Sequence, residues 1–242
     1  MEIRRQDENE MLARLHQNFE YLQRELGLTR QPVGIKIFFS QQEYEACSFP
    51  KSDYRMSYCV YVEKATRGRA LKHRLENHYC DGGTTAFHLE YPSDHIESGA
   101  EYFSYGLYRT QAAAKRVRDG VEGLYRNRVE VVGIATGPLS AFDIVPDIVL
   151  ILGVSGQIML MVQGYVFNSG DRMEFSTAAM QGICSETSVQ PFIKGKINVS
   201  MLCPSTRTLA KWKEEEMAMG IPFELLDQVV EGIENIRINL EG

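Results

Sequence analysis

The chain lacks the features that mark membrane, exported and nucleic-acid-binding proteins. Its longest apolar stretch, residues 148–162, is interrupted by two glycines, a serine and a glutamine, so it is too short to cross a bilayer. The first residues contain no apolar segment of the signal-peptide type, and we therefore expect a cytoplasmic protein. With 26 Lys and Arg against 32 Asp and Glu, the net charge is −6, which argues against nucleic acid as a partner.

Cysteine is scarce, and no CxxC pair is present. The five cysteines are Cys47, Cys59, Cys80, Cys184 and Cys203. In the cytoplasm we expect them to stay reduced, which leaves core packing, metal binding or a reactive thiol as their uses. The 242 residues, 44% of them hydrophobic, are enough for a substantial core, so folding itself requires neither a metal nor a disulfide.

The periodicity of the apolar residues predicts alternating helices and strands. Helices are predicted over residues 7–26, 60–78, 110–124, 156–167 and 223–236, and over part of 177–195. Strands are predicted over residues 32–39, 99–108, 129–139, 147–154 and 196–203. The strand at 147–154 is nearly all apolar, as expected for a strand buried on both faces.

These elements indicate an α/β fold, a single domain with a mixed sheet flanked by helices. We divide the chain into an N-terminal amphipathic helix, residues 1–27, and an α/β domain, residues 28–242. Gly27 is expected to end the helix.

Four of the cysteines lie at the ends of predicted elements, where loops converge. They are Cys59, Cys80, Cys184 and Cys203, whereas Cys47 lies in a polar loop. Four thiolates from separate segments satisfy either a tetrahedral zinc ion or a [4Fe–4S] cluster. Spacing alone favours separate buried cysteines over a metal site, and a metal site over a catalytic thiol, because free cysteine is among the most buried residue types.

Glycines follow one of these cysteines directly. Cys80 is succeeded by Asp81, Gly82 and Gly83, and glycine lets other atoms approach the backbone closely. We expect Gly82 and Gly83 to leave room for a bulky cofactor or ligand beside the Cys80 thiol.

Four other side chains are candidates for contact with a substrate. Lys36, on the predicted strand 32–39, could hold an anion, and the forked guanidinium of Arg207 could bind a carboxylate through two hydrogen bonds. His78 and His88 flank the Cys80 turn and could act as general acids or as zinc ligands. Each of these residues could instead have an ordinary structural role.

Taken in order, several stretches resemble the DUF169, or archaeal-conserved-region, family, over roughly residues 25–235. The stretches that carry the resemblance are QPVGIKI, CDGGTTAFHL, SGAEYF, PDIVLILG, GICSETSVQPF, NVSMLCPSTR and EEEMAMGIP. The cysteine positions of that family fall on Cys59, Cys80, Cys184 and Cys203, and Cys47 has no counterpart. The chain departs from the family pattern at His88, where the family has glycine.

The resemblance implies a function as well as a fold. The family is concentrated in anaerobes, which favours an oxygen-sensitive [4Fe–4S] cluster over zinc. We therefore expect an iron–sulfur oxidoreductase of anaerobic metabolism that acts on a small anionic substrate; a Lewis-acid lyase is less favoured. The same cysteines are compatible with a non-catalytic electron-transfer partner or sensor, or with a zinc-stabilised small-molecule-binding protein. The chain could also form a homo-oligomer.

Overall fold

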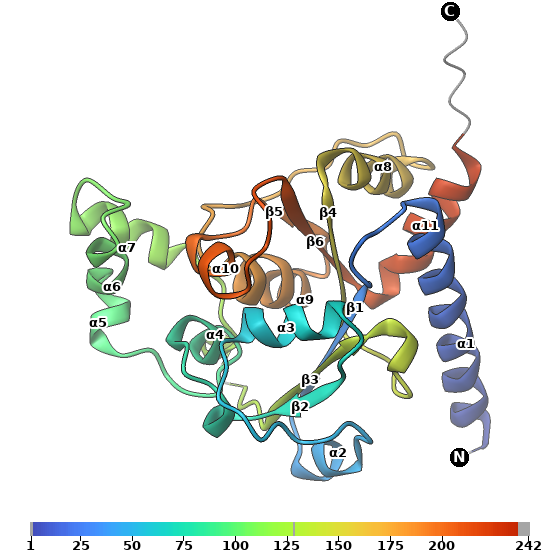
Figure 1. Cartoon of the computed structure of the whole chain (residues 1–242), viewed down its shortest axis with the longest axis horizontal. Coiled ribbons are helices and arrows are strands. Elements are labelled where there is room, and N and C mark those ends of the chain that lie inside the picture. The colour runs from blue at the N-terminus through green and yellow to red at the C-terminus, as the bar shows by residue number, and fades with distance from the viewer. Residues whose placement is uncertain (1, 128, 237–242) are drawn as a thin grey trace, which may run out of the picture.

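A six-stranded sheet organises the chain, which the computed structural model describes over residues 2–127 and 129–236 (Figure 1). The strand order is β2-β3-β1-β4-β6-β5. The strands are β1 (Val33–Phe38), β2 (Leu71–His73), β3 (Gly133–Pro138), β4 (Ile148–Val154), β5 (Asn198–Ser200) and β6 (Glu216–Pro222). Helices cover both faces, so the predicted α/β fold is confirmed.

Three helices cover one face of the sheet, and most of the shorter ones cover the other. The first group is α1 (Glu2–Glu25), α8 (Ser155–Val166) and α11 (Leu226–Asn235). The second group is α3 (Tyr58–Thr66), α4 (Asp81–Ala86), the π-helical segment η4 (Gly182–Val189), α9 (Gln190–Lys194) and α10 (Pro204–Leu209). Three more helices form a lobe at one end of the molecule: α5 (Asp94–Glu97), α6 (Ala100–Ser104) and α7 (Gln111–Asp119) (Figure 1). The remaining elements are α2 (Gln41–Ala46) and the 3₁₀ turns η1 (Leu75–Asn77), η2 (Leu124–Asn127), η3 (Leu139–Ala141) and η5 (Phe223–Leu225).

The position of strand β4 in the sheet explains why its sequence is almost entirely apolar. Leu150 and Leu152 enter the core on the side of α3, and Val149 and Ile151 enter the core on the side of α1. Both faces are therefore buried, as predicted. All strand pairings are antiparallel, in contrast to the mixed sheet expected from the sequence. A strand that is buried on both faces is apolar throughout, whichever way it runs. Its sequence therefore does not show whether it pairs in a parallel or an antiparallel direction.

Two predicted elements differ from the structure, and one observed strand was not predicted. Helix α3 ends well before residue 78, because Gly68 adopts a left-handed φ of 92°, and the following residues form strand β2. The predicted strand 99–108 is instead helix α6, which starts after the left-handed Gly99. Strand β6 has no clear signal in the sequence, because alanine, methionine and glycine have little preference for strands.

The N-terminal helix shares the core of the rest of the chain. Leu15, Leu22 and Leu26 pack into the same cluster as residues of α8, α11 and the sheet. The helix is followed by Gly27 at a φ of 56°, in agreement with the predicted stop. Residue 1 of the predicted segment 1–27 and residues 237–242 of the predicted segment 28–242 lie outside the described residues.

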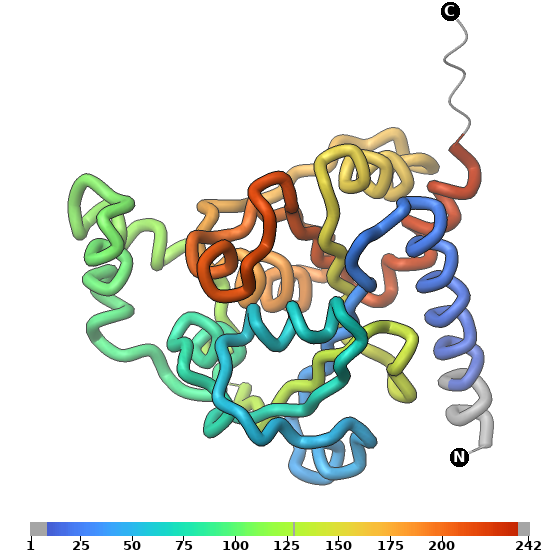
Figure 2. The backbone as a smooth tube through the Cα atoms, viewed as in Figure 1, coloured from blue at the N-terminus to red at the C-terminus, as the bar shows by residue number. Residues whose placement is uncertain are grey.

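The segments that carry the four predicted cysteine ligands meet on the α3 side of the sheet. Figure 2 shows that α3, α4, η4 and α10 come together although they are far apart in the chain. Among the described residues, no helix is both long and apolar enough to span a membrane.

Helices α8 and α11 cross at two glycines, which yields a stability prediction. A Cβ atom at Gly164 would lie 2.6 Å from the carbonyl oxygen of Val229, and one at Gly232 would overlap the Gly164 carbonyl. We expect Gly232→Ala to lower the free energy of unfolding by about 1–3 kcal/mol, although alanine favours helices. Urea unfolding measures the change. Gly156→Ala in α8 is the control, because no atom lies within 4 Å of the added Cβ. Equal or greater stability of the Gly232 variant would contradict the crossing.

Candidate functional site

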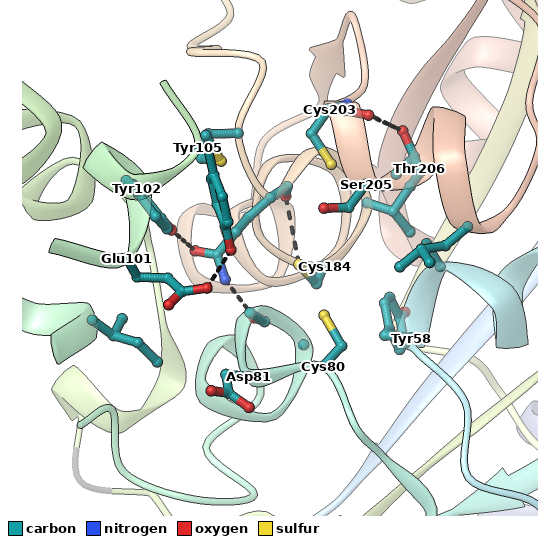
Figure 3. A pocket seen from close by; sticks show the side chains of 18 of the residues that line it. Tyr58, Cys80, Asp81, Glu101, Tyr102, Tyr105, Cys184, Cys203, Ser205 and Thr206 are labelled. Atoms are coloured by element: carbon teal, nitrogen blue, oxygen red, sulfur yellow. Dashed lines mark hydrogen bonds between the residues drawn. The ribbon is translucent and has the colours of Figure 1, made fainter. Parts of the chain in front are cut away.

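Four helical segments begin at one cavity of about 280 Å³. Its wall includes Cys59, Cys80, Cys184 and Cys203, the four cysteines singled out in the sequence. Figure 3 shows the side chains of Cys80, Cys184 and Cys203 directed into the same space. Cys47 lies apart, in the core on the other face of the sheet.

Each of these cysteines occupies the start of a helical segment. Cys80 is the residue before α4 and Cys203 the residue before α10, at their N-caps. Cys59 and Cys184 lie in the first turns of α3 and η4. The first backbone N–H groups of a helix have no partner within it, so these positions favour negative charge such as that of a thiolate.

The backbone is unusual beside two of the cysteines. Gln181, just before η4, and Leu202, just before Cys203, adopt left-handed φ values of 54° and 70°. Residues other than glycine rarely occupy this region, and π-helical segments such as η4 are also rare. Both features concentrate at functional sites, where surrounding contacts hold the strained geometry.

Glycines bring the cysteine-bearing segments close together. A Cβ atom at Gly83 would lie 2.9 Å from the Cβ of Tyr58, the neighbour of Cys59. A Cβ at Gly182 would lie 2.8 Å from the Cα of Leu202.

Gly82 is similarly close to Gln181. The sequence predicts that Gly82 and Gly83 make room for a cofactor. Both glycines line the cavity. The space left by the absence of a side chain is occupied mainly by neighbouring protein segments.

Burial holds the thiols in their neutral form. It raises the pKa of Cys59 to about 12, although a hydrogen bond 3.1 Å long from the Ser57 hydroxyl opposes the shift. Burial also raises the pKa of Cys80, against hydrogen bonds from the amides of Gly83 and Gly82.

The neighbouring thiols also influence the ionisation of Cys184. Burial raises the pKa of Cys184 well above its ordinary value, and negative charge on Cys80, Cys203 or Cys59 raises it further. Such mutual effects require the sulfur atoms to lie near one another. A cation among them would therefore relieve both desolvation and repulsion.

Four cysteine thiols are a donor set that both zinc and iron–sulfur clusters accept. Within the described part of the chain, no three His, Cys, Asp or Glu side chains are close enough together to hold one metal ion. A zinc ion needs its ligands at about 2.3 Å from one centre. A [4Fe–4S] cluster binds each cysteine through a different iron, so it needs thiols arranged around a shared space. Cys59, Cys80, Cys184 and Cys203 have that chemistry and surround one cavity.

The four predicted substrate-binding side chains do not line this cavity. Lys36 Nζ forms an ion pair of 2.8 Å with Asp147, and Arg207 donates to backbone carbonyls, including that of Glu216 at 2.9 Å. His88 Nδ1 donates to the Val129 carbonyl.

His78 is buried in a small cluster away from the cavity wall. Its Nε2 lies 2.9 Å from Nδ1 of His73, and its own Nδ1 has no partner. Both histidines adjoin the ring of Tyr61. His78 therefore does not share the cavity with the Cys80 thiol, although it lies only two positions before it.

Sequence reasoning missed the wall that faces the cysteines. Tyr102 and Tyr105 of the lobe line the cavity, together with Glu101 (Figure 3). The Tyr102 hydroxyl donates to Gln181 Oε1 at 2.6 Å, and Gln181 Nε2 donates to the Gly82 carbonyl, so the lobe is joined to two cysteine-bearing segments. The available signal is the aromatic run at residues 99–108, whose composition favours a strand.

The buried histidine pair predicts acid sensitivity of the fold. Burial lowers the pKa of His78 from 6.5 to about 4, and burial together with His78 lowers that of His73. The unfolded chain binds these protons more readily, so stability present above pH 6.5 is lost as the pH falls through 4. For His78 the loss is about 3 kcal/mol.

Urea unfolding between pH 7.5 and 4 measures this loss. We expect His78→Gln to flatten the pH dependence and His95→Gln, an exposed control, to leave it unchanged. Parallel curves for wild type and His78→Gln would contradict the role of burial.

Comparison with known proteins gives the family. The profile of DUF169, an uncharacterised ArCR family, matches residues 21–232. The chain is 24% identical over 225 residues to the uncharacterised protein MJ0308 of Methanocaldococcus jannaschii, a match that covers 92% of this chain and 95% of that protein. No solved structure matches. The resemblance seen in the sequence motifs is confirmed: the chain belongs to the DUF169 family.

Proposed function

We propose that this chain is a cytoplasmic iron–sulfur protein of anaerobic metabolism. Cys59, Cys80, Cys184 and Cys203 would hold a [4Fe–4S] cluster, and the protein would act as a redox enzyme on a small substrate. One observation carries the proposal: cysteines from four distant segments line a single cavity. The five cysteines are all free, as a reducing compartment requires.

The surroundings of the thiols suit electron transfer. A bound cluster would supply single electrons, and four cysteine ligands leave no iron open for Lewis-acid chemistry. The Ser57 hydroxyl and the amides of Gly82 and Gly83 donate to sulfur atoms, and such hydrogen bonds tune a reduction potential. Cys59, Cys184 and Cys203 are buried, which limits the access of water to their sulfur atoms, and Cys80 is half-buried.

The opposite wall offers groups for a substrate. Tyr105 donates its hydroxyl to Glu101 at 2.5 Å, and Asp81 adds a second carboxylate to the wall. These carboxylates would repel the anionic substrate expected from the sequence. Phenol and carboxylate groups instead suit a neutral substrate that exchanges hydrogen bonds or protons with the wall.

A non-catalytic electron carrier is the second candidate. It is favoured by the placement of Lys36 and Arg207, the expected substrate ligands, outside the cavity. The cavity wall of the lobe favours an enzyme, because a carrier needs no space for a substrate beside its centre.

Iron and sulfide analysis tests the proposal directly. Protein purified and reconstituted without oxygen should hold about four iron and four sulfide per chain and absorb visible light. We expect Cys80→Ser and Cys184→Ser to lose most of this iron, because each removes a ligand. Cys47→Ser is the matched control and should retain it, since Cys47 lies on the other side of the sheet.

A reconstituted wild-type chain without iron would overturn the cluster. Bound zinc in place of iron, released by Cys80→Ser, would favour a zinc-stabilised protein. Equal iron loss in Cys47→Ser would show that the variants act through folding rather than ligation.

The raised thiol pKa values predict that loading releases protons. Cys59, Cys80 and Cys184 are protonated at neutral pH, and each must lose its proton to bind iron. Loading in the presence of a competing chelator should therefore increase between pH 6.5 and 8.5. A pH-indicator dye in weakly buffered solution measures the protons released, and loading that is independent of pH would contradict protonated ligands.

A further inference from the structure

A second hollow, of about 430 Å³, lies next to the cysteine cavity. We call it the basic groove. Its wall consists of Glu63, Lys64, Arg67, Arg69, Leu209, Ala210 and Lys211. Four cations and one carboxylate make it locally positive, on a chain whose net charge is −6.

Among the described residues, most of this positive charge has no neutralising partner. Arg67 pairs with Glu63 at 2.5 Å. The side chains of Lys64, Arg69 and Lys211 form no hydrogen bond or ion pair with any described residue. Long cationic side chains that remain unpaired around one hollow attract a negatively charged partner.

Two helices connect the basic groove to the thiols. Helix α3 has Cys59 in its first turn and Lys64 in its last, and α10 begins directly after its N-cap residue Cys203 and ends at Leu209. Leu209 lines both the cavity and the groove. At 1.5 Å per residue, each path along a helix axis is about 8–9 Å long.

The exposed side chains of the groove suit contact with the surface of another protein. Arg67, Arg69 and Lys211 are exposed, and the exposed Leu209 lies among them. An apolar contact within a charged rim is typical of protein interfaces. Complexes for electron transfer are small, and opposite charges guide their formation.

We propose that the basic groove docks a small acidic electron-transfer protein, which exchanges electrons with the cysteine-lined site through α3 and α10. This inference rests on the proposed function and names its partner. In each encounter the reduced partner loses one electron and the cysteine-ligated centre gains it, with no bond made or broken.

A charge-reversal experiment tests the docking. The groove variant is Lys64→Glu, Arg69→Glu and Lys211→Glu. The control variant, with the same change in net charge, is Arg109→Glu, Arg172→Glu and Lys196→Glu, three exposed residues outside the groove. Circular dichroism and thermal unfolding verify that both variants fold.

The probe is an acidic flavodoxin, and calorimetry measures its binding at low and at high salt. We expect wild type to bind at low salt and to weaken as salt is added. The groove variant should bind at least about tenfold more weakly, and the control variant within about threefold of wild type. Stopped-flow absorbance should show a parallel loss in the rate of electron transfer from the reduced flavodoxin to the iron-loaded chain.

Absence of binding by wild type, or equal weakening in both variants, would overturn the docking site. Binding of single-stranded RNA that is lost in the groove variant, without binding of flavodoxin, would also overturn it. Iron analysis separates the two proposals: a wild-type chain without iron refutes the proposed function, whereas calorimetry on the same protein decides the role of the groove.

Discussion

Close approach between backbones is the constraint on which the cysteine cavity depends. At Gly220 of β6, an added Cβ would overlap the carbonyl of Thr187, so η4 lies directly on the sheet. Gly182 in turn contacts Leu202, and Gly83 contacts Tyr58. Three glycine contacts thus fix the positions of four thiol-bearing segments. Any side chain at these positions would widen the spacing and move a sulfur out of the shared space.

Electrostatics sets the second constraint. Burial of four thiols near one another makes the ionised forms costly, which is why the pKa values of Cys59, Cys80 and Cys184 are raised. Neutral thiols pack without this cost. A positively charged centre among ionised thiols would turn mutual repulsion into attraction.

The sequence indicates where four cysteines lie relative to helices and strands, but not which groups surround them. Four of them stand at element ends marked by local signals, such as an apolar run that stops before a turn. The partner of Lys36, Asp147, is 111 residues away, and Arg207 donates to a backbone carbonyl 9 residues away; no local pattern encodes either contact. In the lobe, aromatic residues such as Tyr102 favour a strand, yet the left-handed Gly99 and the hydrogen bond from Tyr102 to Gln181 hold a short helix instead. Local propensity fails where contacts far along the chain hold a segment.

The two sides of the cavity are built from different elements. In the proposed function, one side would contact the substrate and the other would receive electrons. The lobe contributes phenols and a carboxylate, whereas α3 and α10 connect the thiols to the positively charged surface. A substrate bound against Tyr105 and a partner docked near Leu209 would approach the same centre from separate walls. Neither would then need to leave before the other binds, so electron delivery and substrate turnover could alternate at one site.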